Sequence, residues 1–367
     1  MENMMKAAVT LKTGKGFTTT EIRIADPIGR EVLVDVKASG LCLTDHSLMA
    51  NDFGFPLPAV FGHELAGVVT AVGPDVTEFQ VGDHVVGCLV QWCGRCQPCI
   101  EGIQTDCLNP LAVERSAGEE PRLVGSDGPI YQGMGLGGFA EKALVHENQL
   151  ARVNDEIPFS RAALLGCGTV TGAGAVINSA KVAPGDTVAV IGTGGVGLNA
   201  IAAARLAGAK TIIAVDIQDT KLDMATRFGA THVVNSRNTD PVEEIRRISG
   251  GGVDYAFEII GLPATQMQAI AAAKTSGTAV LVGMGKPGAK IEIETSAAFL
   301  ATHKTIKAVM MGSTNLKRDI PFYADMYVAG RYNLDDLVTN EISIDEIDEA
   351  YDSLASGTVI RSVITRF

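Results

Sequence analysis

The hydrophobic pattern of the chain changes character between its first 150 residues and the stretch that begins near residue 170. In the first part, short apolar runs at 31–38, 66–73 and 83–90 end in glycine-containing turns or lead into a cluster of cysteines. Short runs bounded by turn-forming residues predict strands. Long helical periodicity is scarce here, so we expect a barrel-like β domain.

From about residue 170, apolar strand-like runs alternate with alanine-rich segments of helical period. Strands that alternate with helical crossovers predict a parallel, doubly wound sheet of the Rossmann type, so the expected fold class is α/β with an additional β-rich domain. After Gly312 the pattern is mixed again, with an amphipathic stretch at 346–357 and a short strand at 360–367. The six strands predicted for the sheet cover 187–192, 211–216, 231–236, 253–260, 278–284 and 305–311.

Composition narrows the classes of function open to the chain. Its 367 residues, 46% hydrophobic and 20% charged, are enough for two domains with substantial cores. A formal net charge of −12 argues against nucleic acid as a partner, because a phosphate backbone needs basic patches. No apolar run predicts a membrane span or a secretory signal. We therefore predict a cytoplasmic protein, whose seven cysteines are better suited to metal binding or catalysis than to disulfides.

A glycine-rich turn, IGTGGVG (191–197), follows a predicted strand and opens a predicted helix. Gly192, Gly194 and Gly197 have the GxGxxG spacing, in which backbone N–H groups at the helix N-terminus face a pyrophosphate. Asp216 ends the next strand, where a carboxylate accepts from ribose hydroxyls and repels a 2′-phosphate. The pattern favours NAD over NADP; the alternative is a structural turn with a surface aspartate.

Four cysteines lie within fifteen residues in the spacing C-x2-C-x2-C-x7-C. Four thiolates so close in sequence can surround one tetrahedral ion, which favours a structural zinc with no open position. An iron–sulfur cluster or disulfides remain as alternatives. Cys88 lies outside this set, in an apolar run, and is most simply a core thiol. The four cysteines are Cys93, Cys96, Cys99 and Cys107.

The remaining candidates for metal ligands are Cys42, Cys167 and the pair His63–Glu64. Two thiolates and one imidazole leave a fourth position free for water or substrate, which is the arrangement of a catalytic zinc. No local spacing joins these residues, however. Buried cysteines and hydrogen-bonded histidines with no metal therefore stay open as alternatives at this point.

Over essentially its whole length the sequence resembles the zinc-dependent alcohol dehydrogenases of the medium-chain dehydrogenase/reductase family. The resemblance implies a GroES-like catalytic domain at 1–170 and 312–367 and an NAD-binding Rossmann domain at 171–311. It is carried by GxCxxD (40–45), GHExxG (62–67), VGDxV (81–85), the four-cysteine segment, GCGxxTG (166–172), GTGGVG (192–197) and Asp216.

The resemblance also implies two zinc ions per subunit and assigns the residues that hold the catalytic one. Cys42, His63 and Cys167 would be its ligands, and Glu64 would be a transient ligand. Asp45 would orient the imidazole of His63. Thr44 would hydrogen-bond the alcohol hydroxyl and accept its proton. Around the cofactor the resemblance places Thr171, Gly195, Val196, Lys221 and Arg361.

The residues after Cys42 depart from the family pattern. Leu43 stands where a histidine or arginine often helps to hold the pyrophosphate, so that contact is lost or moved. Ser47 stands where several relatives have a histidine that passes the proton to solvent, and His46 comes one position earlier. We consider His46 as a substitute in proton transfer, with a surface histidine as the alternative.

Three further positions bear on substrate and assembly. The 60 positions from Cys107 to Cys167 resemble the longer-looped members of the family, which favours a homodimer. Leu111 stands where the glutathione-dependent class has an arginine, which counts against a glutathione conjugate as substrate. The resemblance implies that Leu89 and Phe53 line the substrate pocket, with Leu89 where relatives often have a phenylalanine. A roomier apolar pocket predicts a medium-chain, terpenoid or aromatic primary alcohol.

Two rival interpretations remain beside an ordinary alcohol dehydrogenase. In the first, NAD(H) is held so tightly that a second substrate recycles it in place, as in nicotinoprotein relatives. In the second, the chain binds NAD and zinc without catalysis and has a structural or sensing role. All three zinc ligands and the hydroxyl of Thr44 are present, which counts against the second.

Overall fold

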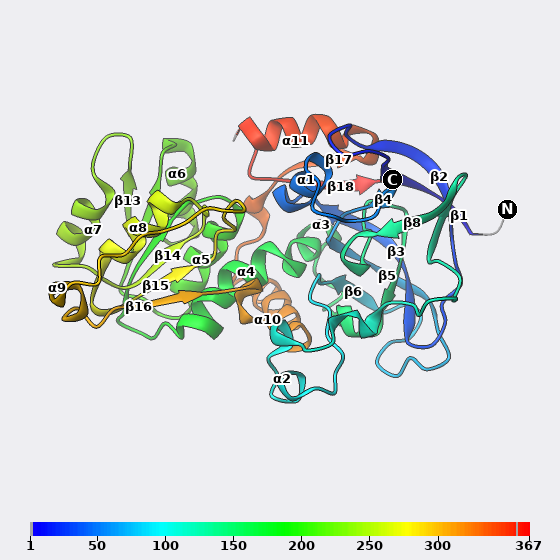
Figure 1. The fold of residues 1–367 in the computed structure, drawn as a ribbon, viewed down its shortest axis with the longest axis horizontal. Coiled ribbons are helices and arrows are strands. Elements are labelled where there is room, and N and C mark those ends of the chain that lie inside the picture. The colour runs from blue at the N-terminus through cyan, green and yellow to red at the C-terminus, as the bar shows by residue number, and fades with distance from the viewer. Residues whose placement is uncertain (1–2, 357–358) are drawn as a thin grey trace. The chain divides into compact units, whose positions relative to one another are not determined.

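The computed structural model describes residues 3–356 and 359–367, with the side chains of 355 and 356 left aside. Contacts divide the chain into two compact units, coloured along the sequence in Figure 1. The first unit comprises Met1–Cys167 and Asn315–Phe367, and the second comprises Gly168–Thr314. The sequence placed the corresponding boundaries near residues 170 and 312.

A closed barrel of five strands forms one part of the first unit, and the strand runs predicted at 31–38, 66–73 and 83–90 lie outside it, in a second sheet. Strand β1 pairs antiparallel with β2, and Ala7, Ala8 and Val9 of β1 belong to a buried hydrophobic cluster. The barrel follows the order β1 (Met4–Thr10), β2 (Thr18–Ile24), β7 (Leu123–Gly125), β8 (Gly128–Gln132) and β4 (Ala59–Val60).

A second sheet of the first unit brings distant parts of the chain to one place. Strand β3 pairs antiparallel with both β5 and β18, so Gly40 lies opposite Glu64 on one side and opposite Val363 on the other. The sheet order is β10 (Leu150–Arg152), β6 (His84–Gly87), β5 (Glu64–Val72), β3 (Glu31–Gly40), β18 (Arg361–Arg366) and β17 (Val338–Ser343), with β9 (Lys142–His146) also on β3.

The helices of the first unit include two that the hydrophobic pattern does not predict. Helix α1 begins directly after Cys42, so the residues that follow this cysteine lie on a helix rather than on a strand or turn. Helix α10 is amphipathic and carries Pro321 inside it, which obscured its helical pattern. The helices are α1 (Leu43–Ala50), α2 (Gln97–Ile100), α3 (Phe159–Ala162), α10 (Leu316–Val328) and α11 (Ile347–Ser356).

The second unit contains the predicted six-stranded parallel sheet, with helices packed along it (Figure 1). Its order reverses between β11 and β14, and such a reversal is where doubly wound sheets bind their ligands. The order is β13 (His232–Asn235), β12 (Thr211–Asp216), β11 (Thr187–Ile191), β14 (Val253–Glu258), β15 (Ala273–Leu281) and β16 (Thr305–Ala308). Its helices are α4 (Gly168–Gly174), α5 (Gly195–Leu206), α6 (Asp219–Phe228), α7 (Pro241–Ser249), α8 (Pro263–Ala272) and α9 (Ala297–Leu300).

No single helix in the described residues has both the length and the apolar character needed to cross a bilayer. One bent pair, Phe159–Gly166 with Gly168–Ala180, meets the test by length and composition.

Candidate metal centres and cofactor site

Four potential metal ligands converge in the interior of the first unit. The ligand atoms of Cys42, His63, Glu64 and Cys167 all lie within 4.8 Å of one another. The Nε2 atom of His63 lies 3.3 Å from the Sγ atom of Cys167. Two sulfurs, one imidazole nitrogen and a nearby carboxylate form a donor set that suits zinc and leaves room for a further ligand.

The local backbone explains how residues so far apart in sequence meet. Cys42 lies just before α1, at the end of β3, and His63 lies just before β5, which pairs with β3. Gly62 has a φ of +96°, and a Cβ atom there would lie 2.5 Å from Phe139. Only glycine fits this position, so Gly62 fixes the turn that presents His63.

Asp45 fixes the orientation of the His63 ring. Its Oδ2 atom lies 2.9 Å from His63 Nδ1, and its Oδ1 atom accepts a hydrogen bond of 3.1 Å from the backbone N–H of Gly62. The Nε2 atom is thereby the ring nitrogen that faces the cysteines. A carboxylate behind a ligating histidine sets its tautomer and raises its basicity.

The charges around the cluster fit a bound cation. The pKa of the Cys42 thiol is well below its usual value, because Cys167 donates to it and His63 lies close, against the effect of burial. The pKa of Cys167 is correspondingly raised by the neighbouring Cys42 sulfur and by burial. Two thiolates side by side in the interior disfavour each other, and a divalent cation would allow both to ionise.

Glu64 and Arg361 form a buried pair at the edge of this cluster. The Glu64 side chain is fully buried, and its Oε1 atom lies 3.4 Å from Nη1 of Arg361. Burial raises the pKa of Glu64 to about 7, although the positive charge of Arg361 opposes this effect. Arg361 also donates to the carbonyl of Leu41 at 3.1 Å. The structure thus places Arg361, which the resemblance assigned to the pyrophosphate, against a carboxylate beside the metal ligands.

The residues that follow Cys42 occupy the first turns of α1. Thr44 is half-buried, and Leu43 is 53% exposed. The ring of His46 lies 5.1 Å from the ring of Tyr351, which comes from α11. Residues two apart on a helix point in different directions, so Thr44 and His46 do not face each other.

The four-cysteine segment folds into a compact lobe of the first unit. The sulfurs of its cysteines all lie within 4.8 Å of one another. The Sγ atom of Cys107 accepts from the backbone N–H groups of Cys93 at 3.2 Å and Asn109 at 3.4 Å. Backbone donors from Leu108 and Cys99 lower the pKa of Cys96 to about 6. Four sulfurs with backbone donors fit a closed, tetrahedral structural zinc.

The glycine-rich turn of the second unit has the backbone geometry that a pyrophosphate needs. Gly192 has a φ of +96°, and a Cβ atom on Gly197 would lie 1.9 Å from the Gly192 carbonyl oxygen. An added Cβ on Gly194 would meet nothing within 4 Å, so the space over this turn is open. Gly194 begins α5 without a side-chain cap. The first turn of α5 therefore offers its backbone N–H groups to an anion.

Asp216 lies at the end of β12 and accepts four hydrogen bonds from the protein. Its Oδ2 atom accepts from the backbone N–H of Thr193 at 2.9 Å and from the Thr193 hydroxyl at 3.0 Å. Its Oδ1 atom accepts from the N–H groups of Ile217 at 2.7 Å and Gln218 at 3.2 Å. The other residues predicted around the cofactor lie on α4 (Thr171), in the first turn of α5 (Gly195, Val196) and on α6 (Lys221).

Sequence reasoning missed two residues of the second unit. The first is Thr193, and only its position inside the GxGxxG turn could have indicated a role for it. The other is Glu258, fully buried at the end of β14, whose Oε1 atom accepts from the N–H groups of Ile260 and Gly261, both at 2.8 Å. An acidic residue inside the apolar run at 253–260 could have signalled it. Glu258 shapes the loop whose Ile260 packs against Gly192.

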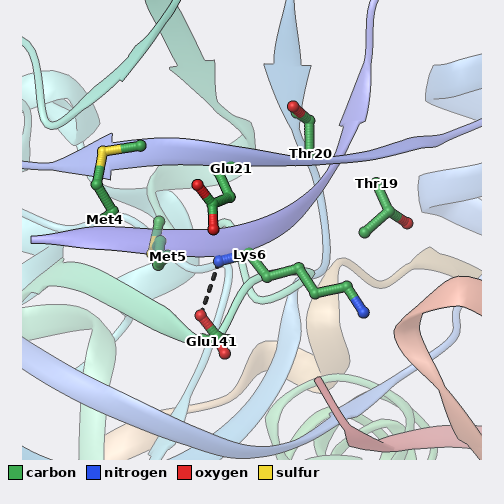
Figure 2. A pocket seen from close by; sticks show the side chains of 7 residues that line it. All are labelled: Met4, Met5, Lys6, Thr19, Thr20, Glu21 and Glu141. Atoms are coloured by element: carbon green, nitrogen blue, oxygen red, sulfur yellow. Dashed lines mark hydrogen bonds between the residues drawn. The ribbon is translucent and has the colours of Figure 1, made fainter. Parts of the chain in front are cut away.

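A separate hollow lies along β1 and β2 (Figure 2). Its volume is about 420 Å³, and it contains none of the predicted site residues. The backbone N–H of Lys6 donates to Glu141 there at 2.7 Å (Figure 2). The hollow is lined by Met4, Met5, Lys6, Thr19, Thr20, Glu21 and Glu141.

Comparison with known proteins agrees with these features. Residues 29–155 match the alcohol dehydrogenase GroES-like domain, and residues 195–326 match the zinc-binding dehydrogenase domain. The chain is 35% identical to S-(hydroxymethyl)glutathione dehydrogenase of Paracoccus denitrificans, over 98% of this chain and 99% of that protein. The chain belongs to the zinc-dependent alcohol dehydrogenases of the medium-chain dehydrogenase/reductase family. The predicted family and fold class are thereby confirmed.

Solved structures of zinc-dependent alcohol dehydrogenases and related dehydrogenases resemble the whole chain. Benzyl alcohol dehydrogenase of Acinetobacter calcoaceticus is 37% identical, with a TM-score of 0.92 and all of both chains covered. A zinc-binding dehydrogenase of Sinorhizobium meliloti, solved with NADP, is 28% identical, with a TM-score of 0.83 and 99% of each chain covered. As a zinc-dependent alcohol dehydrogenase, the chain is an oxidoreductase that uses zinc and a nicotinamide cofactor.

Proposed function

We propose that this zinc-dependent alcohol dehydrogenase oxidises a medium-chain, terpenoid or aromatic primary alcohol to the aldehyde with NAD, and catalyses the reverse reaction. The observation that carries the proposal is the interior cluster of two thiols, one oriented imidazole and one carboxylate within 4.8 Å. A set with one open coordination position suits a substrate oxygen. A structural lobe with four sulfurs supplies the second of two proposed zinc sites.

The residues of the cluster have separate tasks in this proposal. Cys42, His63 and Cys167 would hold the catalytic zinc, and Asp45 keeps Nε2 of His63 directed at Cys167. When bound, zinc would supply a Lewis acid that lowers the pKa of a coordinated hydroxyl toward about 7. Glu64 pairs with Arg361 and lies within 4.8 Å of the other ligand atoms, so it would be a transient ligand that leaves Arg361 when it joins them.

Proton removal starts at Thr44 in the proposed mechanism. Its half-buried hydroxyl accepts the proton of the substrate hydroxyl and passes its own outward. His46 is the candidate for the outer group, but α1 turns it away from Thr44. Transfer between the two therefore needs an intervening hydroxyl or water. Replacing His46 with glutamine tests this step, because a loss of turnover that added imidazole restores supports a relay through His46.

The substrate class is proposed from apolar side chains that the family resemblance places along the substrate pocket. Leu89 is half-buried, and Phe53 is 47% exposed on the segment that also carries Phe55. The ring of Phe55 stacks on Tyr131 at 5.9 Å, which gives this segment an aromatic wall. Leu111 is 65% exposed and offers no cation for a glutathione carboxylate. The benzyl alcohol relative supports an aromatic alcohol, whereas the glutathione-dependent relative names the main alternative.

Steady-state rates against a panel of alcohols test the substrate class. We expect kcat/KM for benzyl alcohol and hexanol to exceed that for ethanol and for S-(hydroxymethyl)glutathione. A preference for ethanol would show that the pocket is small, and a preference for the glutathione adduct would show that another cation replaces the one missing at Leu111. Replacing Leu89 with phenylalanine provides a matched variant with a smaller pocket.

The preference for NAD over NADP is proposed from Asp216. Its carboxylate is 9% exposed and held at the end of β12, where a 2′-phosphate would meet a buried negative charge. Steady-state rates for the alcohol panel, measured with NAD and with NADP, check this preference. Extraction of nucleotide from the gel-filtered protein distinguishes an exchangeable cofactor from a permanently bound one, which is the nicotinoprotein alternative.

A homodimer is proposed from the free edge of the second unit. Within the described residues β16 pairs only with β15, so its outer edge presents unpaired backbone groups. Ile306 on this strand is 36% exposed and Met310 after it is 66% exposed. Exposed edges of this kind pair with another chain. Light scattering on the variant with Ile306 replaced by lysine tests whether a second copy of the chain covers this edge.

The cytoplasmic location of the protein stays a prediction.

A further inference from the structure

The carboxylate of Asp216 has no unused acceptor position in the structure. A carboxylate has two oxygens with about four lone-pair sites. Two donors from Thr193 meet Oδ2, and the N–H groups of Ile217 and Gln218 meet Oδ1. A ribose hydroxyl can therefore donate to this carboxylate only if it displaces one of these four donors or shares an acceptor position with it.

Only one of the four donors is able to give way. Three of them are backbone N–H groups, held by the turn after β11 and by the start of the segment after β12. The fourth is the hydroxyl of Thr193, whose hydrogen rotates about its C–O bond. Thr193 is 1% exposed, so protein surrounds its side chain and its hydroxyl has Asp216 as partner.

We propose that the Thr193 hydroxyl occupies, in the free protein, the acceptor position on Asp216 that an adenosine ribose hydroxyl takes when the cofactor binds. This inference rests on the proposed use of NAD. Thr193 is then a positioning residue that acts through Asp216. Because one hydrogen bond to the carboxylate is exchanged rather than gained, the Thr193 hydroxyl lowers the affinity for NAD and speeds its release.

The opposite role for Thr193 predicts an effect of the opposite sign. If its hydroxyl served mainly to hold the Asp216 side chain in place, its removal would weaken cofactor binding. Three backbone N–H groups already fix that carboxylate without it. We therefore expect Thr193→Val, which keeps the shape and the backbone donor, to bind ADP-ribose and NAD about fivefold more tightly.

Isothermal titration of the full-length protein measures this without relying on turnover. The probes are NAD, ADP-ribose, AMP and 2′,3′-dideoxy-AMP, which lacks both ribose hydroxyls. In Thr193→Val the gain in affinity appears with the first three probes and vanishes with the dideoxy nucleotide. Thr193→Ser keeps a hydroxyl at this position, so we expect it to have the Kd and the NADH release rate of the parent.

Each outcome decides the inference. An unchanged or weaker Kd for ADP-ribose in Thr193→Val, in a variant that binds NAD and melts like the parent, overturns it. An equal gain with the dideoxy nucleotide also overturns it, because the effect would then not involve the ribose hydroxyls. If the parent protein binds neither NAD nor ADP-ribose, the proposed cofactor is wrong as well, so the two failures are distinguishable.

Discussion

The Oδ2 atom of Asp45 lies 2.9 Å from Nδ1 of His63, and both side chains are 1% exposed. The same carboxylate accepts from the N–H of Gly62, which directly precedes the histidine. Asp45 therefore joins α1 to the loop before β5 as well as orienting one ring. The helix that follows one proposed zinc ligand thus positions another.

Replacing Asp45 with asparagine keeps the size of the side chain and removes its charge. We expect zinc affinity at the catalytic site to fall by about 10–100-fold, because the imidazole loses the partner that sets its tautomer and basicity. Competition with a chelator, followed by metal analysis, measures this. Asp35→Asn is the matched control, since Asp35 pairs with Lys37 on the surface of β3. Equal zinc retention in the two variants would contradict the role of Asp45.

Serine at Cys42 or at Cys167 removes one thiolate from the interior cluster. We expect the zinc content to fall by about one ion per subunit and turnover to be abolished, because an alcohol oxygen is a poor substitute for a thiolate on zinc. Cys88→Ala is the control: burial raises the pKa of the Cys88 thiol to about 12, so it stays protonated. Activity that survives Cys42→Ser would exclude this cluster as the reaction centre.

Serine at Cys107 acts on the lobe instead. Its sulfur accepts from two backbone N–H groups and closes the set of four. We expect the protein to lose about one zinc and the segment 93–107 to become sensitive to protease, because a structural zinc contributes directly to folding. The catalytic zinc should remain bound. Loss of both ions together would show that the two sites are not independent.

Glu31 gives a prediction for stability against pH. It is 3% exposed and pairs with Arg115 at 2.6 Å and Arg122 at 2.7 Å. Burial raises its pKa, but the two arginines outweigh burial, so the net pKa lies below the ordinary 4.5. The unfolded chain therefore binds this proton first on acidification. The stabilisation is complete above about pH 4.5 and is lost as the pH falls through the folded-state pKa.

Glu31→Gln removes this charge and leaves two buried guanidinium groups facing an amide. We expect the melting temperature at pH 7 to fall by roughly 6–12 °C, from a cost of about 3 kcal/mol and about 2–4 °C per kcal/mol. The difference in melting temperature between parent and variant should become smaller as the pH falls below 4.5. Calorimetric scans from pH 3 to 7 check this, with the exposed Glu21→Gln as control. A difference in melting temperature that does not change with pH would mean that Glu31 acts through packing alone.

The second unit was the part of the fold most open to prediction from the sequence. Each of its strands is an apolar run followed by a helical segment, and this alternation leaves few topologies. Helix α1 was not predicted, because its eight residues mix polar and apolar types without a clear stripe. Helix α10 was missed because Pro321 interrupts an otherwise helical pattern.

The candidate sites also divide into one that the sequence spacing indicates and others that depend on the fold. The cysteines of the lobe are near neighbours in sequence, so spacing alone indicated their common site. Cys42 and His63 meet because Gly40 lies opposite Glu64 in the sheet, and no local spacing contains that register. Cys167 joins them from 104 residues further along the chain than His63. Thr193 was missed for a similar reason: its role depends on Asp216, which belongs to the neighbouring strand.

Strand β18 lies inside its sheet, between β3 and β17, and carries Arg361 to the buried Glu64. During synthesis the whole of Gly168–Thr314 leaves the ribosome before residues 361–366. The Rossmann sheet is therefore able to close while the other sheet still lacks an inner strand. The side chain that pairs with Glu64 beside the proposed catalytic zinc site is thus among the last parts of each molecule to be made.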